Sequence, residues 1–384
     1  MIPYAKHHIL NSDIKAVSEV LRSDFLTQGP KVPLFEKKIS KYVSSKYAVA
    51  CNSATSALHL ACMSINLKEG DLVWTTPITF VASANAALYC GAKVNFVDID
   101  LHTFNICINS LQARLIDARK KNRLPKVLIV VHMAGSPCDM HEIRKLSYEY
   151  GFKVIEDASH AIGASYSNKK IGGCHYSDAC IFSFHPAKII TTGEGGMLLT
   201  NDEEMFNKAQ LLRTHGITKD NKQFQFKSHG PWYYEQHLLG FNFRMNDIEA
   251  ALGISQFNRI DSYISSRNRI AKIYNEELSE LNIALPTVLE NSLSSFHLYI
   301  IRLLDPKHIA AKKNIVKKLH AMGVGVQIHY IPVNMQPFYG AMNIKDTYPN
   351  SNIFYSSAIS LPMYPQLKMK EIIKVLDSLK EIIL

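Results

Sequence analysis

The fold is decided by residues 153–188, which read KVIEDASHAIGASYSNKKIGGCHYSDACIFSFHPAK. Two short apolar runs, Lys153–Asp157 and Ala179–Phe184, indicate strands, and the glycine pair at 172–173 marks a turn between them. The first run ends in an acid, Asp157, and one short turn after the second run comes Lys188. Open parallel sheets bind their ligands where the strands end. The segment therefore predicts two strands of an α/β sheet with chemistry at their carboxyl ends.

The same alternation of β-branched runs and helical stretches extends on both sides of this segment, from about residue 46 to residue 200. It is typical of a mostly parallel sheet that is covered by helices on both faces. The further strands that we expect are Tyr47–Cys51, Asp71–Thr75, Lys93–Asp98, Lys126–His132 and Met197–Thr200. The helices that we expect between them are Ser56–Ile65, Phe80–Cys90 and Met140–Tyr150.

A second unit follows a polar and aromatic loop at 217–238. Two helices are expected at 246–263 and 267–281. Further along, the pattern predicts a strand at 298–304, a helix at 311–322 and a strand at 324–330. We therefore expect a large domain over residues 1–250 and a smaller α+β domain over 251–384.

Composition limits the function classes. The chain has 384 residues, of which 47% are hydrophobic and 20% charged, so a packed globular protein is expected. The formal net charge is +10, but the densest basic stretches, 119–121 and 312–318, form no basic stripe. The charge therefore does not favour a nucleic-acid partner, although it would suit an anionic metabolite.

Cysteine usage and the N-terminus indicate the compartment. The chain has seven cysteines and no C-x-x-C pair, so the pattern favours reduced thiols over a disulfide framework or a zinc site. Residues 1–7 lack a basic start followed by an apolar run, and no uninterrupted apolar stretch approaches the roughly 20 residues of a spanning helix. We expect a cytoplasmic protein without a membrane partner.

Several catalytic motifs are absent. The sequence has no G-x-G-x-x-G after a strand, no G-x-x-x-x-G-K-[ST], no H-E-x-x-H and no G-x-S-x-G. Dinucleotide binding, P-loop phosphoryl transfer, zinc proteolysis and the esterase nucleophile elbow all lose support.

Four features at strand ends carry the chemistry. NSATSAL at 52–58 is either an ordinary helix cap or a phosphate seat formed by free N–H groups at a helix N-terminus. Asp157 either caps the next turn or pairs with a cationic ring nitrogen. Lys188 is either a solvated lysine or a desolvated amine that can form a Schiff base. Phe80 belongs to the core or stacks on a planar ring.

The four features together favour the functional interpretation of each. A phosphate turn, a stacking aromatic residue, a partner for a pyridine nitrogen and a Schiff-base lysine occur in that order along the chain. This combination is typical of an enzyme that uses pyridoxal 5′-phosphate (PLP).

Several segments also resemble a known family. They are similar to those of the DegT/StrS-type nucleotide-sugar aminotransferases of PLP fold type I, and the similarity runs from LTQG at 26–29 to VQIHY at 326–330. The segments that carry it are NSATSAL (52–58), TFVA (79–82), EDASH (156–160), SFHPAK (183–188), TGEGG (192–196) and GFNFRMN (240–246).

The resemblance implies a role for each matching residue. Lys188 would bond covalently to PLP, Asp157 would bind the pyridine nitrogen, and His160 would meet the phenolic oxygen of the ring. The other residues that would contact the cofactor are Phe80, stacked on the ring, Ala54, Thr55 and Ser183 at the phosphate, and Asn242 and Arg244 from a neighbouring subunit. A homodimer with shared active sites is therefore implied.

The resemblance also implies the substrates. L-glutamate would donate its amino group, and C4 of a UDP-4-keto-6-deoxy-N-acetylhexosamine would receive it. The product would be UDP-4-amino-4,6-dideoxy-N-acetyl-β-L-altrosamine, a precursor of pseudaminic acid and of surface glycans such as those on flagellin. Four residues in loops could face the sugar or its diphosphate: His185, His215, His329 and Tyr330.

Three alternatives stay open. The chain could aminate a different keto nucleotide sugar, to a 4-amino or 3-amino product. It could dehydrate a sugar, although members that do so carry His where this chain has Lys188. It could also be a regulatory protein on the same scaffold, which the presence of both Lys188 and Asp157 argues against.

Overall fold

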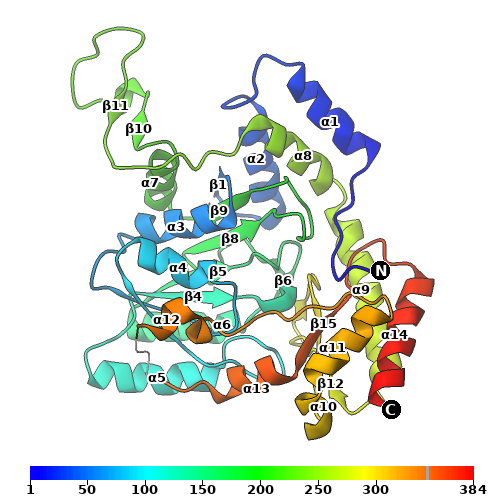
Figure 1. Cartoon of the computed structure of the whole chain (residues 1–384). Helices are drawn as coiled ribbons and strands as arrows, with labels where there is room; N and C mark the ends of the chain where they lie inside the picture. The colour runs from blue at the N-terminus through cyan, green and yellow to red at the C-terminus, as the bar shows by residue number, and fades with distance from the viewer. Residues whose placement is uncertain (343–345) are drawn as a thin grey trace.

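A seven-stranded sheet lies at the centre of the computed structural model, which describes residues 1–342 and 346–384 (Figure 1). The strand order is β1-β9-β8-β5-β4-β2-β3. Strand β9 pairs antiparallel with both of its neighbours, and the other pairs are parallel. The strands are β1 (Tyr47–Cys51), β2 (Leu72–Thr75), β3 (Lys93–Phe96), β4 (Val127–Val131), β5 (Lys153–Asp157), β8 (Ala179–Ser183) and β9 (Gly196–Thr200).

The central strands form because most of their side chains are apolar on both faces. Every residue of β4, β8 and β9 is buried, which is the pattern of strands covered on both sides. All seven expected strands are present, with ends that differ by no more than two residues. The mostly parallel, mixed α/β sheet of the prediction is confirmed.

Helices cover the two faces. Small and apolar residues of α3 (Ala54–Ser64), α4 (Ala82–Tyr89) and α7 (Glu203–Arg213) pack on one face. The opposite face is covered by α2 (Lys31–Val43), α5 (Ile108–Lys120), α6 (Met140–Tyr150) and α8 (Asp247–Phe257). Helix α5 lies in a stretch for which no element was predicted, because only its buried face is apolar, with Leu111, Leu115 and Ala118 spaced as in an amphipathic helix.

The C-terminal part has a core of its own. Strands β12 (Ile283–Ala284), β14 (Tyr299–Leu303) and β15 (Ala358–Leu361) form an antiparallel sheet. Helices α9 (Ile260–Leu278), α11 (Lys312–Ala321) and α14 (Met369–Ile383) pack with it, and α10 (Pro306–Ala310) precedes α11. Figure 1 shows this group to one side of the large sheet, with the N-terminus beside it.

Two local predictions were wrong. No strand forms at 324–330, because Val324 bridges to Ile2 and Gln327 bridges to Ser360, so the two ends of the segment pair with different neighbours and no ladder develops. The break between the two predicted helices lies at 258–259 rather than at 264–266, since α8 ends at Phe257 and α9 begins at Ile260.

A segment of the predicted small domain returns to the large sheet. It contains α12 (Pro337–Gly340) and α13 (Pro349–Ser357). Tyr339 and Tyr348 pack edge-on against Phe96 of β3, and the Asp98 carboxylate accepts the backbone N–H of Ser351 at 2.9 Å. The division of the chain at residue 250 stays a prediction.

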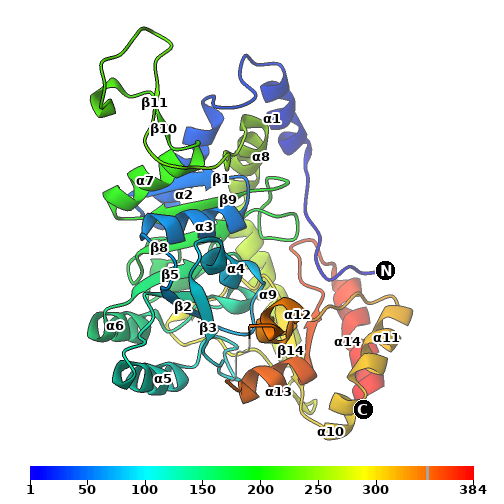
Figure 2. The ribbon, with the colours of Figure 1, turned by 60° about the vertical axis from the view of Figure 1, so that its left-hand side comes forward.

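The remaining elements are short or peripheral. Strands β6 (Ser165–Tyr166), β7 (Lys169–Lys170) and β13 (Ser292–Leu293) form a small sheet, and α1 (Asn11–Leu21) packs on α8. Strands β10 (Ile217–Thr218) and β11 (Glu235–Gln236) carry a loop that projects from the molecule in Figures 1 and 2. Among the described residues, no helix combines the length and the apolar character that a membrane crossing requires.

Candidate active site

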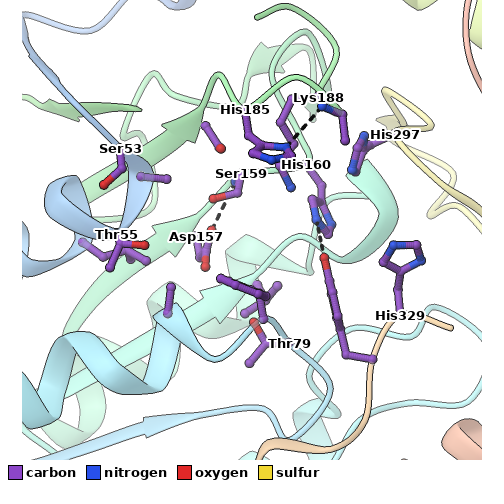
Figure 3. A pocket seen from close by; sticks show the side chains of 18 of the residues that line it. Ser53, Thr55, Thr79, Asp157, Ser159, His160, His185, Lys188, His297 and His329 are labelled. Atoms are coloured by element: carbon purple, nitrogen blue, oxygen red, sulfur yellow. Dashed lines mark hydrogen bonds between the residues drawn. The ribbon is translucent and has the colours of Figure 1, made fainter. Parts of the chain in front are cut away.

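A cavity of about 410 Å³ opens where β1, β5 and β8 end. Its wall includes Tyr4, near the N-terminus, and residues as far along the chain as Tyr330. It brings together most of the predicted site residues: Ala54, Thr55, Phe80, Asp157, His160, Ser183, His185, Lys188, His329 and Tyr330. Figure 3 shows many of these side chains pointing toward one another.

The first turn of α3 forms one wall. Ser53 caps the helix, because its hydroxyl accepts the N–H of Ser56 at 3.1 Å. Ala54 and Thr55 occupy the next two positions, where backbone N–H groups have no partner within the helix. A Cβ at Gly196 would lie 2.4 Å from the nitrogen of Ala54, so only glycine lets β9 approach this turn. The turn therefore presents the positive end of a helix to the cavity.

Asp157 ends β5 and is buried. Its Oδ2 accepts the hydroxyl of Ser83 at 2.5 Å, and its Oδ1 accepts the N–H of Ser159 at 3.2 Å. The hydroxyls of Ser83 and Thr79 lie 2.7 Å apart. Ser83 and Thr79 were not predicted, although their spacing of four residues, across the start of α4, could have indicated that both point the same way. These contacts fix the carboxylate toward the cavity.

The neighbouring residue, Glu156, points to the other face of the sheet. Its Oε2 lies 2.7 Å from Nε2 of His132, and its Oε1 accepts the hydroxyl of Ser177. The N–H of Cys138 donates to Nδ1 of His132 at 3.0 Å, so Nδ1 carries a lone pair and Nε2 holds the proton that it donates to Glu156. This buried network holds β5 at the position from which Asp157 reaches the cavity.

Lys188 lies in the turn that follows β8, and its N–H bonds to the carbonyl of His185 at 2.8 Å. Burial of the amine lowers the pKa of Lys188 to about 8, and the Asp157 carboxylate opposes that shift. At neutral pH an appreciable part of the Lys188 population is therefore the neutral amine, which is the form that attacks a carbonyl or removes a proton.

His160 contributes a buried imidazole. Its Nε2 lies 3.1 Å from the hydroxyl of Tyr330, a contact drawn in Figure 3, and its Nδ1 has no hydrogen-bond partner. Burial, followed by the nearby Lys188 amine and His329, holds the pKa of His160 well below its usual value. Burial likewise raises the pKa of Tyr330, so the pair is uncharged at neutral pH.

His329 lies at the mouth of the cavity beside Tyr4. Its Nδ1 is 2.9 Å from the hydroxyl of Ser360, and the rings of His329 and Tyr4 are 5.4 Å apart. Burial and the Lys188 amine lower the pKa of His329 to about 4. Tyr4 was not predicted, because nothing in the sequence shows that residues 2–4 lie along residues 323–325.

Three predicted residues do not line the cavity: His215, Asn242 and Arg244. Thr214 bridges to Asn242 and Cys51 bridges to Arg244, so this segment runs along the end of β1. The structure therefore places Arg244 beside the residue that ends β1, and all three residues lie outside the cavity wall.

The cavity residues fit PLP. The free N–H groups at Ala54 and Thr55 suit a phosphate, and the Asp157 carboxylate suits a protonated pyridine nitrogen. The unpartnered Nδ1 of His160 suits a polar substituent of the ring, and Lys188 supplies an amine that is partly neutral at neutral pH.

Comparisons with known proteins agree with this geometry. The profile of the DegT/DnrJ/EryC1/StrS aminotransferase family matches residues 7–380. The chain is 39% identical over 385 residues to UDP-4-amino-4,6-dideoxy-N-acetyl-beta-L-altrosamine transaminase from Campylobacter jejuni subsp. jejuni serotype O:23/36, an alignment that covers 100% of this chain and 98% of that protein.

Solved structures show the same architecture. Helicobacter pylori PseC, an aminotransferase involved in the biosynthesis of pseudoaminic acid, superposes with a TM-score of 0.91 at 33% identity, over 100% of this chain and 99% of that chain. The PLP form of Spr1654 from Streptococcus pneumoniae, described as a sugar aminotransferase, gives a TM-score of 0.88 at 28% identity over 99% and 98% of the two chains.

Proposed function

Because the chain belongs to the DegT/DnrJ/EryC1/StrS aminotransferase family and depends on PLP, we propose that it aminates C4 of a UDP-4-keto-6-deoxy-N-acetylhexosamine. L-glutamate is the proposed donor, and UDP-4-amino-4,6-dideoxy-N-acetyl-β-L-altrosamine, a precursor of pseudaminic acid, is the proposed product. The observation that carries the proposal is a partly neutral Lys188 amine in the same cavity as the Asp157 carboxylate.

Asp157 and Lys188 have different tasks in the mechanism. When bound, PLP carries the amino group between donor and acceptor and draws electrons away from the reacting carbon. Asp157, held by Ser83 and Ser159, keeps the ring nitrogen protonated. The Lys188 amine removes the proton from Cα of the donor in the first half-reaction and delivers a proton to C4 of the sugar in the second.

The other cavity residues bind. We assign the phosphate of PLP to Ala54, Thr55 and Ser183, and the polar substituent of its ring to His160. Phe80 is proposed to stack on the ring. His185, His329 and Tyr330 lie at the mouth, where the sugar nucleotide would enter, and they remain the proposed substrate contacts together with His215.

A homodimer with shared sites is part of the proposal. Phe80 is 57% exposed although it lines the cavity, and the projecting loop between β10 and β11 carries Trp232, which is 74% exposed. Bound PLP would cover Phe80, whereas a second copy would cover Trp232 and would bring Asn242 and Arg244 to the neighbouring cavity. We also infer a cytoplasmic location, because all the cysteines of the chain are free.

Mixing two inactive variants tests the shared site. A Lys188→Ala subunit lacks the amine, and an Arg244→Ala subunit lacks the side chain that we propose reaches across the interface. After the two are unfolded and refolded together, a hybrid dimer has one site with both residues intact, so activity returns. If the mixture stays as inactive as either variant alone, each site is built from one chain.

Absorbance spectroscopy tests the reaction. The purified protein with PLP should be yellow, should bleach when L-glutamate is added, and should regain its colour with the UDP-4-keto sugar. The structure of the product, determined by NMR, then separates the altrosamine from other 4-amino or 3-amino sugars and from a dehydrated sugar. A protein that holds PLP but never bleaches with any amino donor would exclude transamination.

A further inference from the structure

Arg267 of α9 is a buried cation without a carboxylate partner. It is 1% exposed, and its Nη1 donates to the backbone carbonyls of Phe296, His297 and Met363 at 3.0–3.1 Å. Its Nε has no partner, and among the described residues no Asp or Glu forms an ion pair with it. Burial lowers the pKa of Arg267 to about 9, so the guanidinium stays charged at neutral pH. A buried charge of this kind is costly unless an anion approaches it.

His297 lies between this cation and the cavity. Its carbonyl binds Arg267, while its ring lines the cavity and contacts the ring of His160, with 4.4 Å between the ring centres (Figure 3). Its Nδ1 has no partner. Burial, followed by His160, Lys188, Arg267 and His329, which are the ionisable groups that face it, holds the pKa of His297 well below its usual value. A buried imidazole without a protein partner for Nδ1 is better explained by a polar ligand than by packing alone.

Four histidines line the cavity, and comparison of the three that are buried singles out His297. His160 bonds to Tyr330, and His329 bonds to Ser360 at the mouth. Only His297 has a positive charge directly behind it. The corner of the cavity at His297 is therefore its most anion-favouring part after the first turn of α3, which suits the phosphate of PLP.

We propose that His297 and Arg267 form the subsite for the α-carboxylate of the amino donor, an inference that rests on the proposed function. Lys188 must reach Cα of the donor to remove its proton, and the α-carboxylate is bonded to that same carbon. His297 donates a hydrogen bond to the carboxylate. Arg267 acts through His297 as a positioning residue, because it holds the backbone of His297 and supplies the positive field.

Separate kinetics of the two half-reactions test the subsite. His297→Phe keeps the shape of the ring and loses the N–H, whereas His297→Gln keeps an N–H donor. Because His297→Phe loses a hydrogen bond to a charged group, its KM for L-glutamate should rise about tenfold or more. His297→Gln should recover part of this loss. The KM of both variants for the keto sugar should stay within about twofold of the wild-type value. His141→Phe, an exposed position on α6, is the matched control and should change neither constant. An equal rise in both KM values, or no rise for L-glutamate, overturns the assignment.

Calorimetry of the PLP-loaded enzyme with glutarate, a dicarboxylate without an amine, gives a readout besides activity. A carboxylate beside His297 raises the pKa of that imidazole from well below its usual value, so binding should take up protons, most strongly at the acid end of the pH range in which the enzyme is stable. The uptake is seen as a binding enthalpy that depends on the ionisation enthalpy of the buffer. His297→Phe should bind glutarate more weakly and lose most of this uptake. Unchanged uptake in His297→Phe overturns the assignment.

The two proposals fail in different ways. If L-glutamate does not bleach the wild-type enzyme, the proposed function fails. If the wild type bleaches normally and His297→Phe binds L-glutamate and glutarate as the wild type does, only the carboxylate subsite fails. Arg267→Met tests the cation itself, and because that variant loses three backbone contacts, the conclusion depends on His297→Phe.

Discussion

The pKa of Lys188 can be measured directly in the protein freed of PLP. Burial lowers this pKa to about 8, and the Asp157 carboxylate works in the opposite direction. With a pKa of about 8, about one tenth of the amine is neutral at pH 7, whereas a lysine in water, with a pKa near 10.4, is neutral in about one molecule of 2,500. The cavity therefore increases the neutral amine at pH 7 about two hundredfold.

Asp157→Asn separates the two influences on Lys188. The substitution removes the negative charge and leaves a side chain of the same shape, so only the desolvation that disfavours the ammonium form remains. The pKa of Lys188 should then fall by about one unit or more, because a nearby opposite charge shifts the pKa of a group by about 1–3 units. At pH 7 the neutral fraction should rise from about one tenth to about one half.

The assay measures the rate at which trinitrobenzenesulfonate labels Lys188 at a series of pH values from about 6 to about 10.5. Mass spectrometry of the peptide that contains Lys188 gives the rate, and exposed lysines in the same digest serve as the internal reference. The wild-type rate should reach half of its maximum near pH 8, and the Asp157→Asn midpoint should lie lower. A wild-type midpoint at pH 10 or above would show that the amine is not desolvated. A midpoint that is unchanged in Asp157→Asn would show that the carboxylate does not act on Lys188.

Four further substitutions test the site and its support. Lys188→Ala should abolish turnover while PLP still binds, which dialysis followed by absorbance measures; turnover near the wild-type rate would contradict the mechanism. Asp157→Ala should slow the glutamate half-reaction on the order of 10³-fold in stopped-flow absorbance, since the ring nitrogen loses its partner; a loss under tenfold would remove Asp157 from that role. Ser83→Ala removes one of the two hydrogen bonds that fix the Asp157 carboxylate and should slow the same half-reaction about tenfold, with an unchanged rate as the contrary outcome. Glu156→Ala leaves the buried donors of His132 and Ser177 without an acceptor, so it should lower the free energy of unfolding by about 2–6 kcal/mol. Glu156→Gln keeps an acceptor and should lose less. Equal losses of the two variants in urea titrations would contradict this account.

Much of the fold could be predicted because the composition of the sequence marks where its strands begin and end. Strands β4, β5 and β8 are short runs of branched and apolar residues bounded by polar ones, so their extent depends on local composition. The predicted cofactor residues of this region follow such runs directly. Since parallel strands end at one edge of a sheet, the alternation of strands and helices already implied that Asp157 and Lys188 lie close together.

The parts that could not be predicted depend on contacts between distant segments. Nothing near Tyr4 shows that the N-terminal segment passes beside Val324 and places Tyr4 at the mouth of the cavity. The role of His297 could not be predicted either, because it depends on Arg267 behind the residue and His160 in front of it. The expected strand at 324–330 was wrong for the same reason: alternating branched residues form a strand only where one neighbour runs alongside them.

The single antiparallel strand explains how these parts come to share one cavity. After Lys188 the chain has to return across the sheet, and β9 does so between β8 and β1, so that Gly196 lies opposite both Ser183 and Cys51. At that crossing a Cβ would lie within 2.4 Å of the Ser53 carbonyl and the Ala54 nitrogen, so the absence of a side chain sets the distance from β9 to the first turn of α3. The glycine run at 193–196 therefore does more than make a turn. It lets β9, the strand that follows Lys188, pack against the first turn of α3, which suits a phosphate. The position of Lys188, where PLP would attach, is thereby linked to the position of the phosphate site.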